Sequence, residues 1–137
     1  WSKYESYWRN MIDFNSKYFA SVPFMPLSGN HESTYRNGEY EIAKHFNLAL
    51  TQQDTSKGVY YSFDYGNAHF VVLNSGTDWS ADQMVPLMEL QKEWLDNDLK
   101  NTDKQWKIVM IHRGIYTEKI RNDGPREVFL EVLDKII

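Results

Sequence analysis

Residues 60–75 read YYSFDYGNAHFVVLNS, and this stretch decides the fold class. Tyrosine, phenylalanine and valine dominate both of its halves, and residues 64–67 between them (DYGN) are typical of a tight turn. The stretch therefore predicts a β-hairpin, with strands near residues 58–63 and 69–74.

Outward from the hairpin, helical and strand patterns alternate along the chain. Apolar residues at helical spacing, or a capped start, predict helices over residues 1–19, 40–48, 86–99 and 123–137. The first of these helices is expected to bury one apolar stripe, and the third to carry Pro86 in its first turn. Two prolines restrict residues 22–27 to a short strand or extended segment. A continuous apolar run at residues 107–111 predicts a strand buried on both faces. This order of elements is typical of an α/β fold layered around a sheet.

Composition narrows the classes of function. A length of 137 residues suits one domain. The chain carries 15 Lys and Arg against 19 Asp and Glu, and this net charge of −4 argues against a nucleic-acid-binding face. No apolar run approaches the roughly 20 residues that a membrane-spanning helix needs. Because the chain has no cysteine, any metal ion must be held by histidine, carboxylate or amide groups.

Polar side chains follow two of the apolar segments. Gly29, Asn30, His31 and Glu32 come directly after the extended segment, and His112 ends the later strand. In layered α/β folds, ligands collect at the carboxyl ends of strands. Imidazole nitrogen and amide oxygen suit zinc, manganese or iron, and a glycine allows the sharp turn that would let its neighbours face one cavity.

The sequence at residues 29–32, GNHE, resembles the G-N-H-[D/E] motif of the calcineurin-like metallophosphoesterases, in particular the purple acid phosphatase branch. Four stretches in the family's order carry the resemblance, namely residues 22–32 (VPFMPLSGNHE), 60–75, 91–99 (QKEWLDNDL) and 106–116 (WKIVMIHRGIY). The resemblance implies a layered α-β-β-α sandwich with a mixed sheet and flanking helices. It also implies hydrolysis of phosphate esters by a metal-activated water at a dinuclear site containing iron, zinc or manganese.

Roles for three residues follow from the resemblance. Asn30 and His112 would be ligands of one of the two metal ions. His31 would lie beside the leaving group, as a general acid or oxyanion stabiliser. Without the flanking matches, His31 would be better interpreted as a surface turn residue. His112 would be better interpreted as a histidine at a strand end whose hydrogen bonds are satisfied.

Other polar residues near these motifs receive weaker assignments. Glu32 is expected to support a histidine rather than bind a metal ion. Arg113 and Tyr116 could contact a phosphate or line the pocket, although solvated loop residues account for both. His69, within a hairpin strand, and His45, on a surface helix, are expected to have no role in the site. Turn formation and helix capping account for three aspartates, Asp64, Asp78 and Asp82.

Three family motifs, D-x-H, G-D-x-x-D and G-H-x-H, do not occur in residues 1–137. The chain is therefore expected to be a single-domain internal segment of a larger catalytic domain. Alone, it would be inactive and would bind metal weakly or not at all. Two alternatives stay open: a non-catalytic module that binds a glycan or a protein, and self-association through exposed sheet edges. The resemblance slightly favours an extracellular location.

Overall fold

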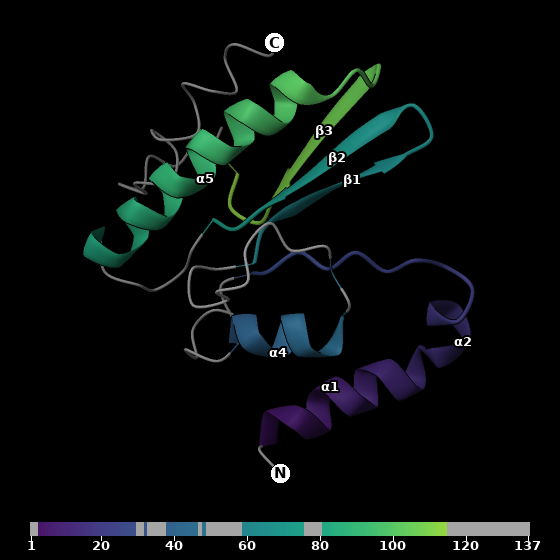
Figure 1. Ribbon diagram of the computed structural model, residues 1–137. Coiled ribbons are helices and arrows are strands. Elements are labelled where there is room, and N and C mark those ends of the chain that lie inside the picture. The colour runs from purple at the N-terminus through teal and green to yellow at the C-terminus, as the bar shows by residue number, and fades with distance from the viewer. Residues whose placement is uncertain are drawn as a thin grey trace.

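The computed structural model describes residues 3–29, 32, 38–46, 48, 59–75 and 81–114. Within them a three-stranded sheet has helices on both sides (Figure 1). Helix α5 (Ala81–Asn101) covers one face of the sheet, and α4 (Gly38–His45) and α1 (Lys3–Phe14) lie toward the other. The predicted α/β class is confirmed.

The sheet has the order β1-β2-β3, with β1 at Tyr61–Tyr65, β2 at Ala68–Leu73 and β3 at Trp106–Ile111. Strands β1 and β2 form the predicted antiparallel hairpin, whereas β3 runs parallel to β2. The turn is shorter than predicted because residues 64 and 65 pair within the hairpin. Gly66 takes a φ of 58°, a backbone conformation that favours glycine.

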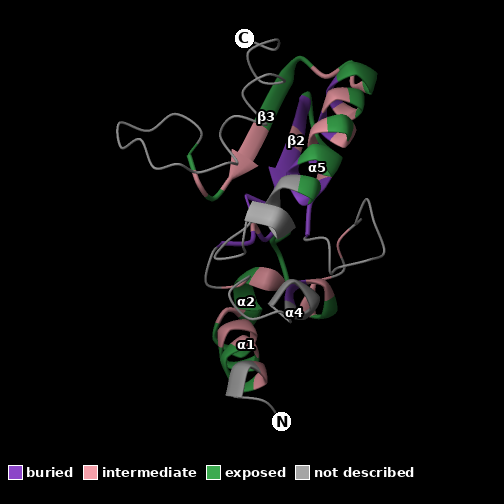
Figure 2. Ribbon diagram, turned by 90° about the vertical axis from the view of Figure 1, so that its left-hand side faces the viewer, coloured by how far each residue is buried: buried purple, intermediate pink, exposed green. Residues whose placement is uncertain are grey.

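Strand β2 is the buried centre of this sheet, and β3 is its edge among the described residues. Nearly every residue of β2 is buried, while the first half of β3 is exposed and the second half only partly covered (Figure 2). The prediction of a strand buried on both faces at residues 107–111 is therefore wrong. A continuous apolar run identifies a strand, but it does not reveal how many neighbours that strand has.

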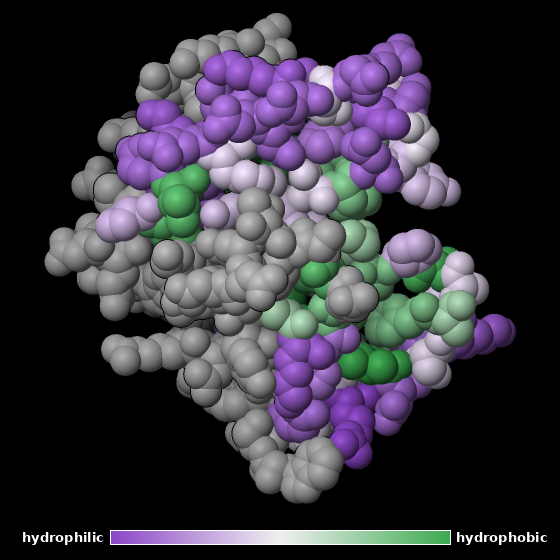
Figure 3. Space-filling model, in the orientation of Figure 1, coloured by the Kyte–Doolittle hydropathy of each residue, from purple (hydrophilic) through white to green (hydrophobic). Residues whose placement is uncertain are grey.

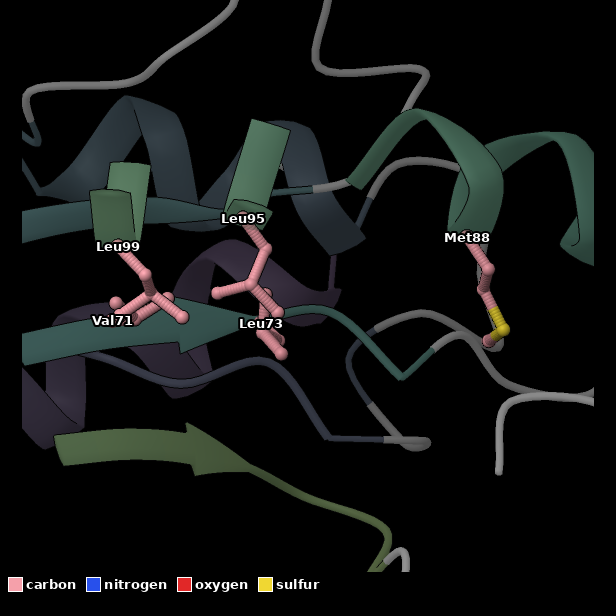
Figure 4. Packing of buried hydrophobic residues seen from close by; sticks show 5 residues of the cluster. All are labelled: Val71, Leu73, Met88, Leu95 and Leu99. Atoms are coloured by element: carbon pink, nitrogen blue, oxygen red, sulfur yellow. The ribbon is translucent and has the colours of Figure 1, made fainter. Parts of the chain in front are cut away.

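The core between α5 and the sheet comes from residues at regular spacing on both elements. Leu95 and Leu99 of α5 point toward Val71 and Leu73 of β2, and Met88 extends the cluster along the helix (Figure 4). The helix predicted over residues 86–99 is confirmed, but it begins earlier.

Pro86 accordingly lies inside α5 and not in its first turn, contrary to the prediction. Its side chain is exposed, so the hydrogen bond lost at the proline lies on the solvent side of the helix, where water can replace it.

The predicted helix over residues 1–19 is instead two helices, α1 and α2 (Ser16–Phe19). The break falls at Asn15, whose side-chain amide donates a hydrogen bond to the Met11 carbonyl. The prediction of a single buried stripe is also wrong. Trp8 is only partly buried where it packs against the hydrophobic cluster that includes Ile42 of α4, and Tyr7 and Tyr18 are exposed. Figure 3 shows hydrophobic side chains gathered where α2 and the following segment lie.

Helix α4 confirms the prediction over residues 40–48, although it begins and ends earlier. Lys44 of α4 donates a hydrogen bond to Glu5 of α1 over 2.6 Å. The helix predicted over residues 123–137 lies outside the described residues. None of the helices that the structure describes is both long enough and apolar enough to cross a membrane.

Candidate functional site

The carboxyl ends of β2 and β3 meet at one edge of the sheet. The two strands are parallel, and their last ladder pair joins Leu73 to Ile111. Residues 74–75 therefore leave β2 beside residues 112–113, which leave β3. Ligand sites in α/β folds form at such an edge.

The extended segment, residues 23–29, is held against the sheet by Tyr61. Its hydroxyl donates a hydrogen bond of 2.8 Å to the Pro26 carbonyl, and its side chain is completely buried. Burial raises the pKa of Tyr61 to about 12, so the hydroxyl keeps its proton throughout the ordinary pH range. This bond fixes the segment that ends at Gly29.

Gly29 brings Glu32 and His112 together. The Gly29 N–H donates a hydrogen bond of 3.0 Å to Glu32 Oε2. A Cβ atom at this position would lie 2.9 Å from Glu32 Oε2, and 3.2 Å and 3.3 Å from His112 Cε1 and Nδ1. Since real Cβ atoms essentially never approach another atom within 3.0 Å, only glycine fits here without displacing a neighbour. The carboxylate and the imidazole thus pack against the same α-carbon.

Three of the six predicted site residues are described, and all three lie at this edge. Glu32 and His112 meet at Gly29, and the backbone N–H of Arg113 donates a hydrogen bond of 3.3 Å to Ser75 Oγ. The other three, Asn30, His31 and Tyr116, lie outside the described residues.

Imidazole and carboxylate groups are among the ligands that zinc, manganese and iron accept. The packing of Glu32 and His112 around a bare α-carbon leaves both groups close enough to serve one site. Their donor chemistry therefore fits a transition-metal site. The set is incomplete, because the described part of the chain contains no group of three or more metal-ligating side chains.

Gln91 of α5 is a buried polar residue next to this edge that the sequence analysis did not single out. It is completely buried, and its amide forms two hydrogen bonds with the backbone of Asn74, at the end of β2. A signal was present in the sequence: Leu87, Gln91, Leu95 and Leu99 recur every four residues, so a glutamine occupies a position on the buried helix face.

Comparison with known proteins decides the family. A sequence model described as calcineurin-like phosphoesterase matches residues 1–135, nearly the whole chain. The chain belongs to the calcineurin-like phosphoesterase family. The resemblance seen in the sequence is confirmed.

The curated relatives of this family member include acid phosphatases. It is 31% identical to acid phosphatase type 7 of Mus musculus over 102 residues, which cover 71% of this chain and 22% of that protein. It is 28% identical to purple acid phosphatase 22 of Arabidopsis thaliana over 123 residues, covering 84% of this chain and 27% of that protein. The chain spans about a quarter of the length of these relatives. No solved structure matches it.

A second polar cluster of the chain lies near the opposite end of β2. His69 Nδ1 is 2.7 Å from Asp64 Oδ1, and His69 Nε2 is 2.8 Å from Asp98 Oδ2. Ser62 donates a hydrogen bond of 2.9 Å to Asp98, and Lys104 Nζ lies 3.7 Å from Asp64. Asp64 thus belongs to β1 and pairs with a histidine, so its assignment to turn formation is wrong. The pairing depends on a contact across the hairpin that turn propensity does not consider.

Two opposing effects act on the pKa of His69. Desolvation by burial lowers it, but hydrogen bonds and charge interactions with Asp64 and Asp98 raise it, and the net direction is upward. The hydrogen bond from His69 lowers the pKa of Asp64, against a smaller desolvation effect. The His69 ring therefore links the hairpin to α5 through its contacts with Asp64 and Asp98.

Three other residues were assigned in the sequence analysis, namely His45, Asp78 and Asp82. His45 stacks on Trp8 with ring centroids 5.5 Å apart, and lies 3.5 Å from Glu5, so it is partly buried between α4 and α1 rather than on a surface. The expectation of a surface helix did not include this contact with α1, which joins segments that are distant in the sequence. Asp78 lies outside the described residues, and of Asp82 only its place within α5 is described.

Proposed function

We propose that this chain forms part of a dinuclear metal site at which phosphate esters are hydrolysed. The observation that carries the proposal is the meeting of Glu32 and His112 at Gly29, on the carboxyl edge of a parallel strand pair in a calcineurin-like phosphoesterase. Relatives named acid phosphatase and purple acid phosphatase support the same reaction class.

Within this proposal, Asn30 and His112 are ligands of one metal ion. Glu32 accepts the hydrogen bond from Gly29 and keeps the turn against the His112 ring, so it orients the ligands. His31 donates a proton to the leaving oxygen or stabilises charge on it. Arg113 and Tyr116 line the pocket for the phosphate group.

When bound, the metal ions, which we propose to be iron, zinc or manganese, would activate water and neutralise charge on the phosphate. The protein's part is to fix the donors and to supply the proton. Because the motifs D-x-H, G-D-x-x-D and G-H-x-H are absent from residues 1–137, we propose that the remaining ligands lie outside this chain and that the chain alone is inactive. An extracellular location remains a prediction from the resemblance.

The proposal is tested by adding Mn²⁺, Zn²⁺ or Fe²⁺ to the purified chain while following the His112 ring by NMR and the hydrolysis of p-nitrophenyl phosphate. We expect metal ions to perturb the His112 signals, less so in Asn30→Ala, with no turnover. A His45→Gln variant is the matched control, since His45 lies between α1 and α4, away from the edge. If none of the metals perturbs His112 even at concentrations high enough to detect weak binding, the proposal fails. Turnover that disappears in His112→Ala would support hydrolysis and contradict the inactivity of the chain alone.

A non-catalytic binding module is the second candidate, favoured by exposed aromatic side chains. Phe14 is 88% exposed, and Tyr7 and Tyr18 are also exposed on α1 and α2. Aromatic surfaces of this kind suit glycan or protein partners. This candidate predicts that metal ions leave His112 unchanged, whereas the first predicts that they perturb it.

A further inference from the structure

We propose that Gln91 and Ser75 are positioning residues that fix the backbone on which His112 stands. The inference deepens the proposed function and rests on it, because it assigns a purpose to groups that touch neither metal nor substrate. It connects a completely buried amide in α5 to the edge of the sheet where Glu32 and His112 meet.

The first step is the contact between Gln91 and the end of β2. Gln91 Oε1 accepts a hydrogen bond of 2.8 Å from the Asn74 N–H, and Gln91 Nε2 donates one of 2.9 Å to the Asn74 carbonyl. A leucine would continue the pattern of Leu87 and Leu95 on this face of α5 and would carry no desolvation cost. The buried amide instead satisfies both backbone groups of one residue, and so fixes the direction in which the chain leaves β2.

The second step is the contact between Ser75 and the continuation of β3. Ser75 is 1% exposed, and its Oγ accepts a hydrogen bond of 3.3 Å from the Arg113 N–H. This bond lies just beyond the last ladder pair, Leu73 and Ile111. A side chain therefore continues the attachment between the strands past the point where their ladder ends.

His112 is held from both sides along the chain, and Gln91 fixes the end of β2 that carries Ser75. Ile111 before it is paired in the sheet, and Arg113 after it is bonded to Ser75. The ring then packs against Gly29. Because a metal ligand must be held within about 0.5 Å of its working position, loss of either bond should displace the imidazole.

The test compares Ser75→Ala and Gln91→Met with the native chain. Ser62→Ala is the matched control, since it also removes one serine hydroxyl, which bonds Asp98 and not the edge of the site. The first readout, without metal, is the NMR cross-peak between Gly29 Hα and His112 Hε1, since His112 Cε1 lies 3.2 Å from the position that a Cβ atom on Gly29 would take. The second is the Mn²⁺ concentration that half-broadens the His112 Hε1 signal.

We expect both variants to lose or weaken the cross-peak and to need about tenfold more Mn²⁺, as is typical when support behind a metal ligand is removed. Ser62→Ala should match the native chain in both readouts. A general loss of stability would not move the cross-peak in a folded chain, so the first readout separates positioning from stability. If Gln91→Met does not fold, Ser75→Ala alone decides.

Folded variants that keep the native cross-peak and the native Mn²⁺ midpoint would overturn the inference. If Mn²⁺ leaves His112 unaffected in the native chain while the variants lose the cross-peak, the positioning role stands and the proposed function fails. The two failures are therefore distinguishable.

Discussion

Gly29 occupies a place that no larger residue can take without moving Glu32 or His112. In Gly29→Ala the new Cβ would lie 2.9 Å from Glu32 Oε2 and 3.2 Å from His112 Cε1. We expect the apparent affinity for Mn²⁺, followed at the His112 ring, to fall about tenfold because the ligand is displaced.

Gly66→Ala is the control for this substitution. Gly66 has a φ of 58°, and a Cβ there would meet nothing within 4 Å. The control should cost about 1 kcal/mol of unfolding free energy through backbone strain and leave His112 unchanged. Equal Mn²⁺ midpoints in Gly29→Ala and the native chain would show that the close packing at Gly29 does not position His112 for binding Mn²⁺.

The His69 cluster predicts how stability depends on pH. Because the pKa of His69 is raised above its ordinary value of 6.5, its contribution is complete below about pH 6.5 and is lost as the pH rises through the pKa of the folded state. Because the pKa of Asp64 is lowered from 3.8, its contribution is present above about pH 3.8 and is lost as the pH falls through its folded value. The cluster should therefore stabilise the fold most between these two values.

Urea unfolding of the native chain and of His69→Gln across pH 4 to 9 measures this dependence. The difference in unfolding free energy between the two should be largest near pH 5 and should shrink above neutrality. A difference that is constant with pH would contradict the presence of a protonated imidazole between Asp64 and Asp98.

Local sequence signals pointed to residues that the structure brings together, and missed longer-range contacts for a physical reason. The glycine-containing turn and the histidine after an apolar strand identified residues that the structure brings together, Gly29, Glu32 and His112. The support from Gln91 and the pairing of His69 with Asp98 join segments 17 and 29 residues apart. Such contacts depend on tertiary packing, which neither propensity nor periodicity describes.

At the scale of elements, α5 contributes most through the residues that face β2. Leu95 is completely buried in the cluster with Val71 and Leu73. Leu95→Ala should lower the unfolding free energy by about 2 to 5 kcal/mol, since it removes buried surface and leaves a cavity.

Leu90→Ala on the same helix is the matched control, because Leu90 is 39% exposed. It should change the unfolding free energy by about 0.5 kcal/mol or less in the same urea titration. Similar losses in both variants would mean that the packing of α5 on the sheet is not the source of its stabilisation.

The elements with a strong residue pattern were predictable from the sequence, whereas their exposure and their exact ends were not. The hairpin follows from its aromatic and β-branched residues and the turn residues between them, and α5 follows from apolar residues at helical spacing. The exposure of β3 depends on which strands neighbour it, and the break between α1 and α2 coincides with a hydrogen bond from the Asn15 side chain to the Met11 carbonyl. Neither property is present in the apolar pattern of the segment itself.

At the scale of the whole molecule, exposed apolar residues on β3 favour the self-association that the sequence analysis left open. Trp106 is 59% exposed and Ile108 is 40% exposed on this edge strand of the described sheet. We expect the sedimentation coefficient of the chain to rise with concentration, and Ile108→Lys to suppress that rise.

Leu90→Lys is the comparison here, because Leu90 on α5 is nearly as exposed as Ile108 but is not on a strand edge. It should leave the concentration dependence unchanged. If the native chain sediments as a monomer at every concentration, β3 does not mediate association.

The parallel pairing of β2 and β3 also sets an order for folding. The hairpin closes over two residues, whereas β3 can join β2 only after the whole of α5 has been traversed. Because long-range closure costs more chain entropy than local closure, the hairpin should form early and β3 late. The strand that immediately precedes His112 should then also be the first to detach in the native state. Amide hydrogens of β3 should exchange with solvent faster than those of β2, so the edge where Gly29 and His112 meet can open and close while the rest of the sheet stays intact.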